Sequence, residues 1–177
     1  MDKKWTTKDF PVGSYRLNSN TQINFQMNRF FRLSNDPEML AELKNVGSQI
    51  HDYGDFIQKF LQLGVASLSN GKKLNAALYF RGAEFFIKES DPRKQKLRNK
   101  FIELINGYYG ITTDQHFNIP YGAHHLSAYR YQANVLQSKG TIMFVGGFDG
   151  YIEESTKTFL ILRDAGYNVI AFEGPGQ

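Results

Sequence analysis

The chain has 177 residues, and its 41% hydrophobic content supports a packed core and excludes disorder of the whole chain. It contains no cysteine, which excludes disulfides, a thiolate nucleophile and a cysteine-based zinc site. Its formal net charge is only +4, no uncharged apolar run approaches the length of a membrane span, and residues 1–10 lack the apolar core of a signal peptide. These features favour a cytoplasmic protein with no membrane partner.

The first half of the chain predicts four helices with short connections. The first starts at Asn35-Asp36-Pro37-Glu38, which offers a capping side chain, a proline near the first turn and an acidic residue. The second has its apolar residues within 56–63, and the third, about 72–88, is apolar nearly all round, which indicates a buried central helix. The fourth begins at Ser90-Asp91-Pro92 and runs to about residue 107. Together they indicate a compact bundle.

The fourth predicted helix also carries a cluster of basic residues. These are Arg93, Lys94, Lys96, Arg98 and Lys100. They share the helix with apolar residues at 101, 102 and 104, and the net charge of the chain is small. The pattern favours a solvated helix face, so we expect no nucleic-acid partner.

The second half changes to strand patterns. Two runs of period two, 116–123 and 125–131, with Gly122 near their junction, predict an antiparallel hairpin. Continuous apolar runs at 142–145 and 169–172 predict strands covered on both faces. The amphipathic helix between these two strands, which Gly166 ends, makes them a parallel crossover unit.

A glycine turn, Gly146-Gly147-Phe148-Asp149-Gly150, follows the first of these parallel strands. Its exposed backbone N–H groups could hold a phosphate or an oxyanion, and a plain tight turn without function stays open as an alternative. The turn does not match the dinucleotide fingerprint G-x-G-x-x-G, which makes nucleotide binding the weaker interpretation. We interpret Glu153 and Glu154, just after the turn, as first-turn helix charges rather than as catalytic groups.

Two segments of the chain resemble a branch of the α/β-hydrolase superfamily. They are residues 146–154, Gly-Gly-Phe-Asp-Gly-Tyr-Ile-Glu-Glu, and residues 171–177, Ala-Phe-Glu-Gly-Pro-Gly-Gln. The branch contains dihydroxypseudooxynicotine hydrolase, the fermentation-respiration switch protein and proteins similar to dipeptidyl aminopeptidase or acylaminoacyl peptidase. Segments 78–86 and 119–122 resemble its cap helix and the start of its sheet. The chain departs from the branch at Gly150, usually serine, and at Glu173, usually aspartate.

The resemblance implies an α/β fold, namely the first strands of an α/β-hydrolase core at residues 111–177 after an all-helical cap or lid at residues 1–110. It also implies a serine hydrolase that cleaves a small-molecule ester or a peptide, with no cofactor and no metal. The backbone N–H of Phe148, with Gly147 as the next candidate, would form one wall of the oxyanion hole. Tyr79 and Phe80 are candidates for lining the substrate pocket, although an aromatic stripe on a buried helix is more often core.

The rest of a catalytic triad is expected elsewhere. No serine of the chain lies in a G-x-S-x-G motif, and the triad of this superfamily follows the oxyanion turn in the order serine, acid, histidine. All four histidines precede the turn, so we expect them at the surface or in the sheet; they are His51, His116, His124 and His125. We therefore expect the remainder of the same polypeptide beyond Gln177 to complete the sheet and the triad, this segment alone to be inactive, and a second copy of the chain to be a further candidate partner.

Two other functions stay open at this point. One is a non-enzymatic helical interaction scaffold, motivated by the aromatic helix pair within residues 72–107. The other is a nucleotide-binding α/β domain that uses the Gly146-Gly147 turn.

Overall fold

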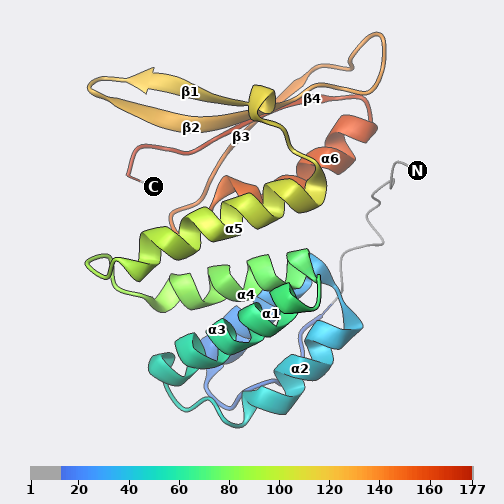
Figure 1. Ribbon diagram of the computed structural model, residues 1–177. Helices are drawn as coiled ribbons and strands as arrows, with labels where there is room; N and C mark the ends of the chain where they lie inside the picture. Colours follow the sequence, from blue (N-terminus) through green and yellow to red (C-terminus); the bar gives the residue numbers. More distant parts are fainter. Residues whose placement is uncertain (1–12, 177) are drawn as a thin grey trace. The chain divides into compact units, whose positions relative to one another are not determined.

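The structure is a computed structural model that describes residues 13–176. Residues 1–10, on which the signal-peptide argument rests, and Gln177, the last residue of the second family motif, lie outside the described residues. The described chain divides into two compact units, a helical unit of residues 13–108 and a sheet unit of residues 109–176 (Figure 1). Across this described range, every helix is too short or too polar to cross a bilayer.

The helical unit contains the four predicted helices and one that was not predicted. The helices are α1 (Thr21–Ser34), α2 (Pro37–Gly47), α3 (Tyr53–Ser69), α4 (Lys73–Phe86) and α5 (Arg93–Tyr109), the last of which ends at the first residue of the sheet unit. The predicted start of α2 is confirmed, because the Asp36 side chain accepts the backbone N–H of Glu38 at 2.9 Å. The central position of α4 is also confirmed, because residues 74–84 are all buried.

Helix α1 has a clear capping residue at each end, although its polar composition hides the helical pattern of its apolar residues. The side chain of Asn20 accepts the backbone N–H groups of Gln22 and Ile23, and Asn35 closes the helix in the left-handed conformation with φ 54°. The buried face carries apolar residues at helical spacing: Ile23, Met27, Phe30 and Phe31. The many Asn, Gln and Arg residues between them give the segment a polar composition, so the caps are its clearest helix signal.

Helices α3 and α4 interlock through two glycines. A Cβ at Gly64 of α3 would lie 2.7 Å from the ring of Phe80 on α4, and a Cβ at Gly82 of α4 would lie 2.5 Å from the ring of Phe60 on α3. Each helix therefore accepts an aromatic ring of the other at a position without a side chain. This arrangement requires glycine at both positions, because even a methyl group would overlap the facing ring.

We expect Gly82→Ala to destabilise the helical unit by about 1–3 kcal/mol, because overpacking against Phe60 outweighs the gain of about 1 kcal/mol in helix propensity. Gly107→Ala is the matched control, since Gly107 is also helical and a Cβ there would meet nothing within 4 Å. That variant should gain about 0.5–1 kcal/mol. Urea unfolding of the full-length protein checks both, and equal effects of the two substitutions would contradict the interlocking.

The sheet unit has four strands in the order β1-β2-β4-β3. They are β1 (His116–Tyr121), β2 (His124–Tyr131), β3 (Thr141–Val145) and β4 (Asn168–Phe172). The predicted hairpin is confirmed: β1 and β2 pair antiparallel, and Gly122 at its turn has φ 57°. The predicted parallel pairing of β3 with β4 is confirmed too, while β2 and β4 are antiparallel. Two short 3₁₀ turns, η2 (Thr113–Gln115) and η3 (Ile152–Ser155), precede β1 and α6 (Thr156–Asp164).

Helix α6 covers one face of the sheet. Registers place Tyr129 beside Ala171 and Tyr131 beside Val169, so these four buried side chains share a face. Phe159 of α6 packs on that face, with its ring centroid 5.3 Å from that of Tyr131. This contact layer is the core of the sheet unit.

The opposite face of β3 differs from the expectation of a strand covered on both sides. Met143 is 70% exposed and Val145 is 56% exposed, and the register aligns them with the half-buried Ile170 and Phe172. Strand β3 also lies at the edge of the sheet that the described residues form. The prediction of coverage on both faces is therefore not met within residues 13–176, because α6 packs only on the face of Tyr131 and Val169.

Candidate functional site

The glycine turn lies at the carboxyl ends of the two parallel strands. It leaves β3 at Gly146, whose N–H donates to the carbonyl oxygen of Phe172 at the end of β4, at 3.2 Å. Gly147 and Phe148, the predicted oxyanion donors, are exposed, Phe148 to 97%. Gly147 is not in the left-handed region, whereas a phosphate-binding nest alternates right- and left-handed residues. The backbone at Gly147 therefore does not form the αR–αL type of anion nest.

The far end of the turn is held by a buried carboxylate. The N–H of Ile152 donates to Oε1 of Glu173 at 3.1 Å, and Glu173 is 4% exposed. The backbone N–H of Glu173 in turn donates to the carbonyl oxygen of Ser127 on β2, at 2.9 Å. Both ends of the turn are thus bonded to consecutive residues, Phe172 and Glu173, at the end of β4.

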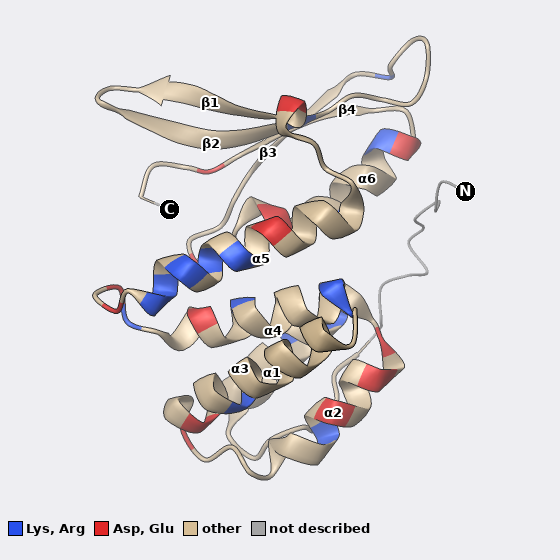
Figure 2. Cartoon of the chain, viewed as in Figure 1, with Lys and Arg blue, Asp and Glu red and all other residues tan. Residues whose placement is uncertain are grey.

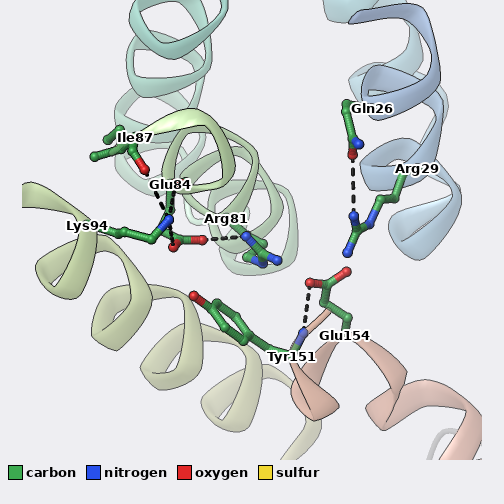
Figure 3. A network of polar contacts seen from close by, with 8 residues as sticks. All are labelled: Gln26, Arg29, Arg81, Glu84, Ile87, Lys94, Tyr151 and Glu154. Carbon is green, nitrogen blue, oxygen red and sulfur yellow. Dashed lines mark hydrogen bonds and ion pairs between the residues drawn. The ribbon is translucent and has the colours of Figure 1, made fainter. Parts of the chain in front are cut away.

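The two glutamates after the turn have different roles. Glu154 accepts the N–H of Tyr151 through Oε1 at 3.2 Å, which is the first-turn role that we predicted (Figure 3). Glu153 is buried, and its Oε1 accepts the hydroxyl of Tyr129 at 3.1 Å. Periodicity gave no sign of this burial, because the contact joins residues on different elements. Beside it, burial raises the pKa of Tyr131 well above its ordinary value.

Tyr79 and Phe80, the predicted pocket residues, lie in the core of the helical unit. Tyr79 is fully buried, its hydroxyl donates to Oε2 of Glu42 at 2.7 Å, and burial together with this bond raises the pKa of the phenol. Its ring meets that of Phe60 edge to face at 5.4 Å. Phe80 fills the space above Gly64. Both contacts belong to helix packing.

The four histidines are all exposed, as expected. A ring nitrogen of His116 lies 2.9 Å from Oγ of Ser127, and this pair belongs to the hairpin. Among the residues that the structure describes, no three His, Cys, Asp or Glu side chains gather as a group that could hold a metal ion.

The helical unit carries a groove of about 480 Å³, a volume within the range of small-molecule sites. It is lined by Thr21, Gln22, Phe25, Gln26, Phe85 and Phe86. Phe25 is 60% exposed, and Phe86 is backed by Tyr53, with ring centroids 4.3 Å apart. The groove therefore has aromatic walls and an amide rim. Sequence reasoning missed it because most of its lining belongs to the unpredicted helix α1.

The basic cluster lies along the first turns of α5 (Figure 2), and only part of it is a solvated face. Arg93 and Lys96 are exposed, and the exposed Arg93 beside Asp91 lowers the pKa of that carboxyl to about 2. Lys94 instead reaches the end of α4, where its Nζ lies 2.9 Å from Oε1 of Glu84 (Figure 3). Arg81 binds the other oxygen of the same carboxylate. The cluster thus serves helix packing at one position and solvent contact at others.

Comparisons with known proteins give structural likeness without sequence similarity. No family model matches the chain, and a search of curated proteins finds no match. A solved structure described as AbyA5 wild type superposes with a TM-score of 0.62 at 11% identity, covering 89% of this chain and 45% of that chain. A second AbyA5 structure superposes with a TM-score of 0.57 at 17% identity, covering 77% of this chain and 41% of that chain. The structure of a 2,6-dihydroxy-pseudo-oxynicotine hydrolase superposes with a TM-score of 0.48 at 17% identity, covering 84% of this chain and 46% of that chain.

At these identities the likeness concerns the fold alone, and the chain spans less than half the length of each of these proteins. The AbyA5 structures have the α/β-hydrolase fold, and the match to the wild-type structure covers most of both units of this chain. The antiparallel hairpin, the parallel pair β4-β3 and the helix between them are the parts of the sheet that this chain contributes. The chain therefore has the first strands of an α/β-hydrolase fold, preceded by a helical unit.

Proposed function

We propose that this chain is the N-terminal part of a serine hydrolase that cleaves an ester or amide bond. The observation that carries the proposal is the turn after β3, which presents backbone at Gly147 and Phe148 at the carboxyl ends of two parallel strands and is bonded at both ends. Backbone donors held in this way stabilise the negative charge that develops on the carbonyl oxygen of an acyl transition state. They need no reorientation during the reaction.

The remaining groups of the reaction are assigned to further sequence of the same polypeptide. A serine would attack the acyl carbon, a histidine would take its proton and return it to the leaving group, and an acid would orient the histidine. The edge position of β3 and the exposed Met143 and Val145 support an adjoining strand and covering helix from that sequence. The motif resemblance at residues 146–154 and 171–177 supports the dihydroxypseudooxynicotine hydrolase branch, with the helical unit as a cap.

The test is covalent labelling of the full-length protein with a serine-directed fluorophosphonate, followed by assays with p-nitrophenyl esters and aminoacyl p-nitroanilides. We expect one serine after residue 177 to be labelled and at least one substrate class to be hydrolysed. Replacing the labelled serine by alanine is the control and should abolish both signals. A folded full-length protein that takes no label and cleaves neither class would contradict the proposal.

A helical interaction scaffold is the second candidate, and the groove beside Phe25 is the observation that favours it. Under this proposal the groove takes an apolar side chain of a peptide partner. Phe25→Ala would then weaken peptide binding, while Val65→Ala, at a similarly exposed position on α3, would leave it unchanged. Fluorophosphonate labelling with no peptide bound would favour the hydrolase instead.

A further inference from the structure

The tip of the oxyanion turn has little side-chain packing to fix its position. Residues 147–149 are exposed, and Phe148 extends its ring almost wholly into solvent. Gly147 has no side chain, and a Cβ there would meet nothing within 4 Å. The way in which the two ends of the turn are held therefore contributes to the path of the backbone through this tip.

The first end belongs to the sheet itself. The bond from the Gly146 N–H to the Phe172 carbonyl continues the parallel ladder of β3 and β4 by one step. Any sequence that forms this ladder can make that bond, because only backbone atoms take part.

Two side chains hold the second end: Glu154 accepts the N–H of Tyr151, and Glu173 accepts the N–H of Ile152. Ile152 is 1% exposed and belongs to the apolar core of the sheet unit, so its N–H must be bonded within the protein. Oε1 of Glu173 accepts that N–H, and the Glu173 backbone is itself fixed to Ser127 on β2. A carboxylate acceptor makes a stronger hydrogen bond than a neutral one.

We propose that Glu173 is the positioning residue of the oxyanion turn: its carboxylate fixes Ile152, and through it the backbone donors at Gly147 and Phe148. The inference rests on the proposed function. Ile152 lies four residues after Phe148, so the loss of the Glu173 carboxylate loosens the end of the turn to which these donors are connected. A shift of about 1 Å in a catalytic group can cost about 100-fold in rate, which sets the scale of the expected effect.

The test compares Glu173→Ala with Glu173→Gln in the full-length protein. The glutamine amide oxygen still accepts the Ile152 N–H, whereas alanine offers no acceptor. We expect Glu173→Ala to lower kcat by about 10- to 100-fold with KM nearly unchanged, and Glu173→Gln to stay within about threefold of the wild type. Pro175→Ala, at an exposed position in the same loop, is the control for disturbance after β4 and should match the wild type.

Three results would overturn the inference. Wild-type kcat in Glu173→Ala would show that the turn needs no side-chain anchor. Equal losses in the alanine and glutamine variants would show that the carboxylate acts through its charge or its proton instead. If the decrease in kcat is proportional to the decrease in thermal stability in both variants, Glu173 has only a structural role.

Hydrogen exchange separates this inference from the proposed function. The Ile152 amide should exchange at least about tenfold faster in Glu173→Ala than in Glu173→Gln, whatever the protein catalyses. If the wild type takes no fluorophosphonate, the proposed function fails, and with it the catalytic role of Glu173. If the wild type is labelled but Ile152 exchanges equally in both variants, the proposed function stands and the anchoring by Glu173 is wrong.

Discussion

Glu84→Ala is expected to destabilise the helical unit by about 3–5 kcal/mol, the usual cost of removing one partner from a buried ion pair. Glu84 lies on α4 with a side chain that is 0% exposed, and it binds two cations. Arg81, whose side chain is 3% exposed, pairs with Oε2, and Lys94 of α5 lies 2.9 Å from Oε1 (Figure 3). Removing the carboxylate leaves both cations without this partner in a poorly solvated place.

The same carboxylate also helps to hold the end of α4. Nζ of Lys94 donates to the backbone carbonyl oxygens of Glu84 and Ile87, at 3.2 and 3.1 Å. These carbonyls belong to the last turn of the helix and the residue after it, where a cation is favourable. A Lys94 that loses Glu84 is drawn toward water, so we expect the end of α4 to fray in the variant.

Urea unfolding of the full-length protein, with hydrogen exchange followed on peptides of α4, measures the effect. Glu103→Ala is the matched control, because Glu103 pairs with Lys100 on α5 at 3.0 Å but is 67% exposed. An exposed pair of this kind contributes only about 0.2–1 kcal/mol. If the two variants lose similar amounts of unfolding free energy, the prediction that the Glu84 carboxylate forms a buried ion pair is contradicted.

The sequence predicted the elements whose signals are local. Asp36 before Pro37 marked the start of α2, and Gly122 between two alternating runs marked the hairpin. The apolar runs of β3 and β4 and the helix between them predicted a parallel pair, because a helical connection of that length is typical of a parallel crossover. Helix α1 was missed although Asn20 and Asn35 cap it, because polar residues outnumber the apolar ones along it.

The candidate site was predicted only as far as the backbone of its turn. The positions of Gly147 and Phe148 follow from the end of β3, which a local pattern shows. The roles of Glu153 and Glu173 do not, because their partners Tyr129 and Ile152 are more than twenty residues away in sequence. Such contacts follow from strand register, and register depends on the packing of the whole sheet.

Phe148→Pro is expected to lower kcat of the full-length protein by about 100- to 1,000-fold, the usual cost of one oxyanion-hole donor. The prediction rests on the proposed function, in which the backbone N–H of Phe148 meets the developing negative charge. Proline has no N–H, so the substitution removes the donor itself. Since Phe148 is 97% exposed, the loss of its ring should leave the thermal stability of the sheet unit nearly unchanged.

Phe148→Ala distinguishes the donor from the side chain. Alanine keeps the N–H and removes only an exposed ring, so its kcat should lie far closer to the wild type than that of the proline variant. Both variants are measured with the substrate that the wild type cleaves, and thermal unfolding shows whether the turn has stayed folded. If the alanine and proline variants lose kcat equally, the ring rather than the backbone serves the reaction; if neither loses any, the oxyanion is bound elsewhere. Only a large loss confined to proline agrees with a turn whose geometry is set at its ends, by Phe172 and Glu173, and whose chemistry resides in its backbone.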